Sequence, residues 1–149
     1  MGYELIEVND PADWAAYHAI RRQELFEAKG RFGIYNPDHP DEYVPQAHPY
    51  LLKLDGVPIG TTRLDVREDG FAIFRMVAIT ASAQGRGHGR IMGQLVEDRA
   101  RAFSATTLYV NAAETALGFY HRTWWVDHVW DPAELVSIAV NATQMRKVI

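Results

Sequence analysis

A glycine-rich segment at residues 84–90, with the sequence QGRGHGR, is the part of the chain best suited to hold an anion. It follows an apolar run at 71–79 and precedes residues 91–103, where apolar side chains recur at helical spacing. A helix starting here would present backbone N–H groups without internal partners and the positive end of its dipole. Glycines let the backbone approach a phosphate closely. The segment therefore predicts a ligand that carries phosphate.

Two common phosphate-binding loops do not fit this segment. The dinucleotide fingerprint G-x-G-x-x-G would need a glycine where the chain has Arg90. The Walker loop would need a lysine directly after its last glycine, and none follows here. A tight strand-to-helix connection that binds nothing remains an alternative for the loop alone.

The composition favours one globular domain over residues 1–149, because 48% of the residues are hydrophobic and 23% are charged. The net charge of −4 argues against a nucleic-acid partner, which would favour a basic surface. No apolar run approaches the roughly 18 residues of a membrane span, and the acidic N-terminal residues are unlike a secretory signal. We expect no membrane association and a cytoplasmic protein.

The chain has no cysteine, which excludes disulfides, a thiolate nucleophile and cysteine-ligated metals. This absence fits a reducing compartment. The six histidines show none of the spacings typical of zinc sites, so we expect no metal.

The first elements are a strand at residues 3–8 and a helix. Asp10 and Pro11 are typical of a helix N-terminus, and Gly30 is typical of the residue after a helix end. Arg21 and Arg22 lie on this helix among acidic residues. That pattern predicts a solvated face with ion pairs along the helix.

Residues 31–48 form the least regular part of the chain, a long segment of the kind that is often functional in compact domains. It carries the acidic residues Asp38, Asp41 and Glu42. They form either a solvated surface loop or a wall of the substrate site that attracts an amine. On the second reading the acceptor is a cationic small molecule.

Three apolar runs, at 50–54, 57–66 and 71–79, are joined by two segments that end in Asp-Gly. Asp-Gly between apolar runs is typical of hairpins, so the sequence predicts three consecutive antiparallel strands. The third strand is apolar on both faces, which places it in the middle of the sheet with helices on each side. Its exception, Arg75, should meet a carboxylate or the solvent end of the sheet.

A short strand at 106–111 should run parallel to strand 71–79, because a helical crossover joins them. Residues 114–121 have a helical pattern, and residues 123–130 and 135–145 are interpreted as closing strands. The apolar stretch 135–140 also suggests a surface through which two copies could associate as a homodimer.

Three motifs together resemble the GCN5-related N-acetyltransferase (GNAT) superfamily. Gln84-x-x-Gly87-x-Gly89 is similar to the family's Q/R-x-x-G-x-G/A loop. Asn111 at a strand end, followed by the run AAETALGFY, is similar to the family's asparagine-to-Phe-Tyr segment, and DGVPIGTTR at 55–63 is similar to its hairpin. The resemblance covers about residues 15–125. It implies an α/β (α+β) acyl-CoA N-acyltransferase fold, with a central mixed, mostly antiparallel sheet flanked by helices.

The resemblance implies acetyl-CoA as the cofactor and assigns a binding site along the strand, the glycine loop and the later helix. The implied binding residues are Met76, Val77, Ala78, Ile79, Gln84, Gly85, Arg86, Gly87, His88, Gly89, Arg90, Asn111, Phe119 and Tyr120. In the family the two strands separate, and the pantetheine arm binds in the gap as an added strand would. His88 would supply only its backbone N–H.

The implied reaction is transfer of an acetyl group to a primary amine, by direct attack in a ternary complex. Tyr120 would protonate the departing thiolate, and Asn111 would orient the pantetheine or the acyl group. Strand 71–79 lacks the glutamate base of some relatives. Asp65, Asp41, Glu42 or a water chain are the remaining candidates for the base.

Other interpretations stay open at this point. The missing strand carboxylate favours a non-catalytic acyl-CoA-binding or sensor domain. A nucleotide- or phosphosugar-binding module could use the same loop. Tyr120 could be an ordinary core residue, and Asn111 could cap the following helix. Thr123-Trp124 also replaces the usual Gly-Phe of the family.

Overall fold

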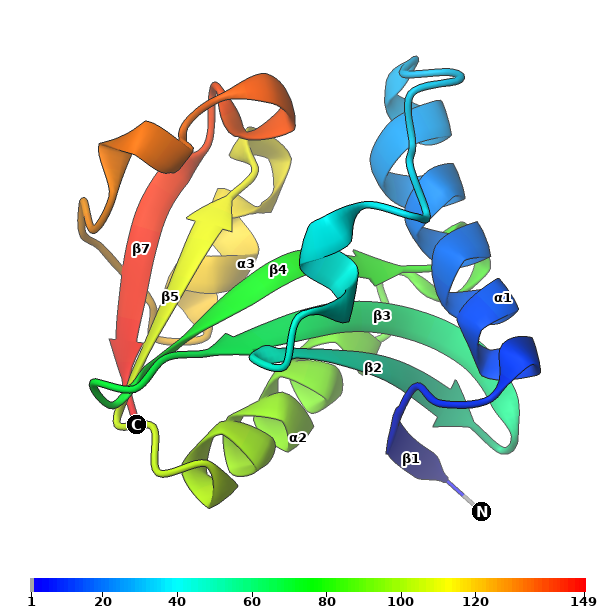
Figure 1. Cartoon of the computed structure of the whole chain (residues 1–149), viewed down its shortest axis with the longest axis horizontal. Helices are drawn as coiled ribbons and strands as arrows, with labels where there is room; N and C mark the ends of the chain where they lie inside the picture. Colours follow the sequence, from blue (N-terminus) through cyan, green and yellow to red (C-terminus); the bar gives the residue numbers. More distant parts are fainter. Residues whose placement is uncertain (1) are drawn as a thin grey trace.

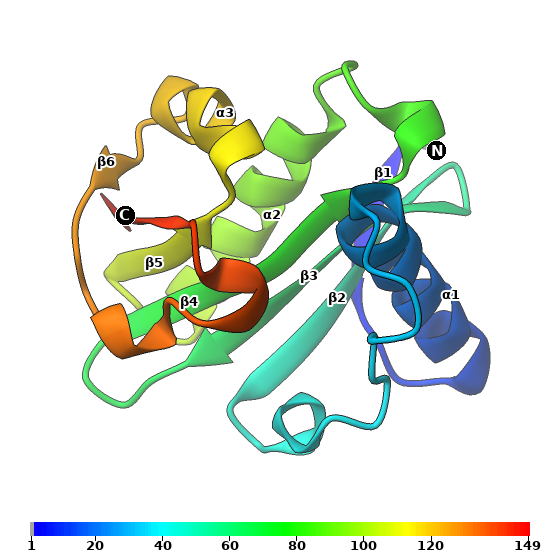
Figure 2. The ribbon, with the colours of Figure 1, turned by 90° about the horizontal axis from the view of Figure 1, so that it is seen from above.

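A computed structural model describes residues 2–149 and shows one seven-stranded sheet with helices on both faces (Figures 1 and 2). The strands are β1 (Tyr3–Glu7), β2 (Ala47–Leu54), β3 (Val57–Val66), β4 (Phe71–Ile79), β5 (Thr107–Ala112), β6 (Val126–Asp127) and β7 (Thr143–Val148). The α-helices are α1 (Pro11–Arg21), α2 (His88–Ala102) and α3 (Leu117–Arg122). The strand order is β1-β2-β3-β4-β5-β7-β6, and only β4 and β5 pair in parallel. The predicted mixed, mostly antiparallel sheet is confirmed.

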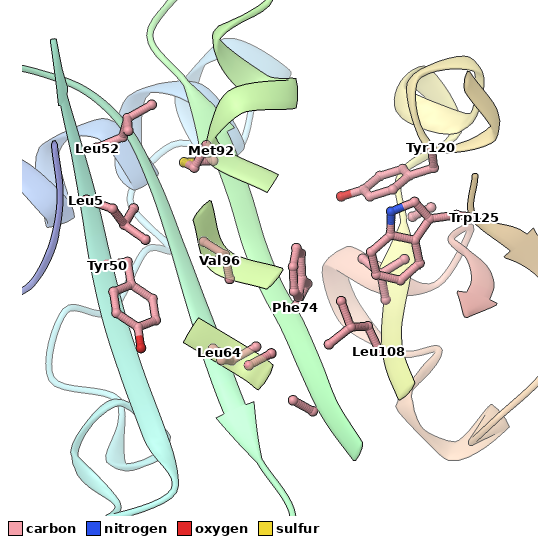
Figure 3. Packing of buried hydrophobic residues seen from close by; sticks show 14 of the residues in the cluster. Leu5, Tyr50, Leu52, Leu64, Phe74, Met92, Val96, Leu108, Tyr120 and Trp125 are labelled. Carbon is pink, nitrogen blue, oxygen red and sulfur yellow. The ribbon is translucent and has the colours of Figure 1, made fainter. Parts of the chain in front are cut away.

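Two apolar clusters hold the helices on the sheet. The larger one lies under α2 and α3 and includes Phe74, Met92 and Leu108 (Figure 3). The smaller one lies on the opposite face, where Tyr17 and Ile20 of α1 pack with Leu51. Because β4 carries residues of both clusters, it is a central strand as predicted.

The signals at the ends of the first helix are confirmed. The Asp10 side chain accepts a hydrogen bond from the Asp13 N–H, Pro11 is the first helical residue, and Gly30 has a left-handed φ of 75°. The helix changes its hydrogen bonding before that glycine. A π-helical turn, Arg22–Phe26, and a 3₁₀ turn, Glu27–Lys29, follow α1.

The meander is also confirmed, with β2, β3 and β4 paired antiparallel in sequence order. Asp55 and Gly56 form the tight turn between β2 and β3, with φ values of 50° and 83°. Positive φ at both central residues is what a type I′ hairpin requires.

The predictions for residues 123–145 are wrong in part. Of segment 123–130, only Val126–Asp127 is a strand, and segment 135–140 contains a 3₁₀ turn, Ser137–Ala139. Ser137 has a φ of 56°, which interrupts an extended backbone. β7 pairs with the free edge of β5. That edge is therefore not open to the apolar stretch 135–140, which forms no strand of the sheet. Within residues 2–149, no helix is long and apolar enough to cross a membrane.

Candidate active site

A cleft opens where β4 and β5 separate. The two strands pair from Phe71 with Thr107 to Phe74 with Val110, and β4 then continues to Ile79 without a β5 partner. Figure 1 shows the two strands diverging from this point. The cleft has a volume of about 1020 Å³. Its lining includes ten of the fourteen predicted binding residues: Met76, Val77, Ala78, Ile79, Gln84, Gly85, Gly89, Asn111, Phe119 and Tyr120.

A β-bulge bends β4 at the point where the strands part. Met76 has a φ of 52°, and the register between β3 and β4 shifts between Thr61 and Arg63. The Thr62 hydroxyl donates to the Arg75 carbonyl at 3.0 Å, which holds the irregular backbone. Bulges of this kind redirect backbone groups beside functional sites. The apolar sequence of the strand gave no signal for it.

The glycine loop joins the end of β4 to the start of α2. The Gln84 side chain donates to the Ile79 carbonyl at 2.8 Å, which ties the loop to the strand. Gly85 and Gly87 have φ values of 76° and 83°, a backbone conformation that side chains disfavour. Gly87 is the N-cap residue of α2, and no side chain caps this end of the helix. The first N–H groups of α2 therefore remain available for an anion.

The other loop residues differ in where they point. Arg86 and Arg90 are exposed and can add positive charge near the helix N-terminus. The His88 ring lies 2.6 Å from the Tyr3 hydroxyl, which directs it toward β1. At Gly89, a Cβ atom would lie 3.5 Å from the Phe119 ring, so α2 and α3 meet closely here.

Tyr120 lies on α3 and is 6% exposed. Its ring packs edge-on against Trp125, and its hydroxyl points from α3 toward β4 (Figure 3). Burial raises the pKa of the Tyr120 hydroxyl well above its ordinary value. The group therefore keeps its proton at neutral pH, as a proton donor must. Tyr120 and Phe119 both line the cleft.

Asn111 lies near the end of β5, and its side chain does not cap a helix. Its amide donates to Glu134 Oε1 at 3.1 Å, and its oxygen accepts from the Gln144 amide at 2.9 Å. The Asn111 side chain is thus fixed between β7 and the segment before it. One amide hydrogen remains for another partner.

Six charged side chains form a row of alternating arginines and carboxylates beside the bulge, here called the charge chain. The sequence analysis did not predict it. Its members are Arg21, Glu42, Arg63, Asp65, Arg75 and Glu134. Contact distances include 2.7 Å from Arg63 Nη1 to Glu42 Oε1 and 3.0 Å from Arg75 Nε to Asp65 Oδ2. Arg75 therefore meets carboxylates, as expected.

Two expectations about charged residues are corrected by this charge chain. Arg21 is 1% exposed, so it is not part of a solvated helix face. Its guanidinium lies over the Tyr17 ring, 4.6 Å from the centroid, and pairs with Glu42. Glu42 is likewise buried between two arginines instead of facing a substrate, whereas Asp38 and Asp41 are exposed.

Two carboxylates of the charge chain, Glu42 and Glu134, are poorly suited to accept a proton. Burial acts to raise the pKa of Glu42, but Arg21 and Arg63 outweigh it and hold the pKa below its ordinary value. The pKa of Glu134 is lowered in the same way, against burial, by Arg75 and then by Asn111. Asp65 accepts two N–H groups from Arg63 and one from Arg75.

The remaining acidic residues that line the cleft are Glu24 and Asp41. Glu24 accepts the Ala81 N–H at 3.0 Å, next to the glycine loop. Among residues 2–149, no group of three or more His, Cys, Asp or Glu side chains is placed to hold a metal ion.

Comparisons with known proteins give one family. The sequence profile of the Acetyltransferase (GNAT) family matches residues 12–124. No curated protein sequence matches the chain.

Solved structures share the fold at low sequence identity. A proposed N-acetyltransferase from Lactobacillus plantarum has a TM-score of 0.79 and 22% identity, over 99% of both chains. An acetyltransferase from Streptococcus agalactiae has a TM-score of 0.78 and 15% identity, also over 99% of both chains.

N-acetylglutamate synthase from Neisseria gonorrhoeae, solved with coenzyme A and N-acetylglutamate, has a TM-score of 0.73 and 17% identity. It matches 98% of this chain, which covers 35% of that enzyme. The family profile covers most of this chain, and the fold is shared with these acetyltransferases. The chain belongs to the Acetyltransferase (GNAT) family.

Proposed function

We propose that the protein transfers an acetyl group from acetyl-CoA to a primary amine, by direct attack within a ternary complex. One observation carries this proposal. The unpaired edge of β4 runs along the cleft and leads directly into a glycine loop at an uncapped helix N-terminus. An extended arm that ends in a pyrophosphate matches both features, because a strand edge and free helical N–H groups are what the two parts of such a ligand need.

The residues present fit acetyl-CoA, which would supply an acyl group activated as a thioester. Backbone groups of Met76, Val77, Ala78 and Ile79 would bind the pantetheine arm. The N–H groups of residues 85–90 would bind the pyrophosphate, with added charge from Arg86 or Arg90. The coenzyme A in the gonococcal enzyme supports this choice, since that enzyme shares the fold.

The proton transfers are assigned to residues of this chain. A carbon–nitrogen bond forms while a carbon–sulfur bond breaks, so the amine loses a proton and the sulfur gains one. Tyr120 is protonated and faces β4, which suits it to donate to the sulfur. Asn111 keeps one amide hydrogen with which to orient the acyl group or the pantetheine.

Gly87→Glu is expected to abolish coenzyme A binding in a calorimetric titration. The new carboxylate would stand at the helix N-terminus, where it would repel the pyrophosphate and compete for its N–H groups. Gly56→Glu is a matched control, because both glycines have a φ of 83° with nothing within 4 Å of an added Cβ. The two variants carry the same charge change and the same backbone strain, but Gly56 lies in the β2–β3 turn.

The titration separates the proposal from its rivals. The wild type and Gly56→Glu should bind coenzyme A, and Gly87→Glu should not. Binding of ATP in place of coenzyme A would favour a nucleotide module and contradict the proposal. Coenzyme A binding without acetylation of any amine would favour a sensor domain.

A further inference from the structure

The cleft has more free cations than free anions. Nine charged residues line it: Glu24, Lys29, Arg31, Asp41, Arg63, Asp65, Arg67, Arg75 and Glu134. Five are basic and four are acidic, so the total alone decides little. The contacts of each group decide which of them can meet a substrate.

The cleft carboxylates nearest the bulge are already saturated. Asp65 accepts three N–H groups from Arg63 and Arg75. Glu134 accepts two from Arg75 and one from Asn111. A substrate ammonium group would have to displace guanidinium groups to reach either carboxylate, which costs more than the new contact returns.

The guanidinium groups beside them are not saturated. A guanidinium has five N–H donors, and Arg75 uses three of them on Asp65 and Glu134. Lys29, Arg31 and Arg67 line the same cleft, and no carboxylate of residues 2–149 lies within ion-pair distance of them. The cleft thus offers free donors to an anion, and of its four carboxylates only Glu24 and Asp41, away from Asp65 and Glu134 in the ion-pair network, are not held by guanidinium groups.

The rim of the cleft adds apolar surface. Val44, Val136 and Ile138 line it and are 41%, 62% and 36% exposed. A molecule bound here would cover these side chains, which favours an acceptor with an apolar body.

We propose that the acceptor is an amine that carries a carboxylate, of the amino-acid class with an apolar side chain. The carboxylate would bind Arg31 or Arg67 while the amine faces the bulge in β4. Nearby guanidinium groups would also lower the pKa of the bound ammonium group and favour the neutral nucleophile. This would reduce the need for a carboxylate base, consistent with the saturated carboxylates. The inference rests on the proposed acetyl transfer.

The test compares an amino acid with its amide, which differs from it only in the carboxylate, and with a diamine as a cationic acceptor. Initial rates of thiol release from acetyl-CoA would be measured with L-leucine, L-leucinamide and 1,4-diaminobutane. We expect kcat/KM for leucine to exceed that for leucinamide by about ten- to a hundredfold, the range for a hydrogen bond to a charged group. The preference would run against the protonation states of the free acceptors, because the less basic α-amino group of leucinamide is present to a larger fraction as the neutral nucleophile at neutral pH.

Two substitutions test which arginine binds the carboxylate of the acceptor. Arg31→Gln or Arg67→Gln should reduce kcat/KM for leucine to near that for leucinamide, so that the ratio between the two acceptors falls toward one. Arg101→Gln is the control, because Arg101 pairs with Glu97 and Asp98 on α2 outside the cleft lining. It should leave the preference intact.

Three outcomes would overturn the inference. The first is equal or better use of leucinamide or the diamine. The second is a preference for leucine that survives both substitutions together. The third is the absence of leucine binding to the protein saturated with coenzyme A. Coenzyme A binding is measured separately. If coenzyme A binds but leucine is not preferred, the inference about the acceptor is wrong and the proposed acetyl transfer still stands. If coenzyme A does not bind, the proposed function itself is wrong.

Discussion

Replacing Glu42 with glutamine is expected to lower the free energy of unfolding by about 3–5 kcal/mol, the usual cost of breaking a buried ion pair by removing one partner. The Glu42 carboxylate lies between Arg21 and Arg63, which are 1% and 8% exposed. Glutamine has the same shape but no charge. The buried guanidinium groups of Arg21 and Arg63 would therefore lose the carboxylate that they share. Urea unfolding would measure the change as a lower midpoint at an unchanged slope.

The neighbouring substitution Asp41→Asn is the control, because Asp41 is exposed. It should change stability by less than about 0.5 kcal/mol. A Glu42→Gln protein as stable as the wild type would show that burial of the arginines does not depend on this carboxylate.

The acid dependence of stability should change in the same variant. Because its arginine neighbours hold the pKa of Glu42 below its ordinary value, the unfolded chain binds protons before the folded one does as pH falls. Stability is therefore lost as pH falls below about 4.3, the ordinary glutamate value. Glu42→Gln should remove this part of the slope and leave the part that comes from Glu134.

Tyr120→Phe is expected to lower kcat by about 10²- to 10⁴-fold, the range for loss of a general acid. Phenylalanine keeps the ring that packs against Trp125, so the KM for acetyl-CoA and the fold should change little. Steady-state rates across several acetyl-CoA concentrations would separate kcat from KM.

Tyr50→Phe is a matched control for the loss of a buried hydroxyl. Tyr50 is fully buried in the same apolar cluster and its hydroxyl has no hydrogen-bond partner among residues 2–149, yet it does not line the cleft. Its kcat should be close to that of the wild type. If Tyr120→Phe were as active as Tyr50→Phe, the assignment of the proton donor to Tyr120 would be wrong.

The parts of the structure that short-range signals specify were predictable from the sequence. Asp10 and Pro11 mark the first helix, Asp55-Gly56 marks a hairpin, and the apolar run 71–79 marks a central strand. The glycine loop was predictable for the same reason, since a strand, glycines and a helix follow one another directly. Each depends on residues within a few positions, where backbone conformation is decided locally.

The charge chain was not predictable, because its partners are far apart in sequence. Arg21 has acidic neighbours on its own helix, so helical spacing predicted pairing at the surface. Its actual partner, Glu42, lies in an irregular segment whose position no local pattern fixes. The closing strand expected at 135–145 was wrong in its first part for a related reason, since only its end lies in β7, Thr143–Val148, which occupies the place beside β5.

The position of β7 in the sheet affects how the protein can assemble during synthesis. β7 follows the other six strands of this sheet in the sequence, but it lies between β5 and β6 and pairs with β5 along Thr107–Ala112. At ordinary translation rates the roughly 30 residues between β5 and β7 take on the order of seconds to produce. During that time one edge of β5 has no partner, and open strand edges promote aggregation. The wall of the cleft that carries Asn111 is therefore completed only after β7 has been made and has paired with β5.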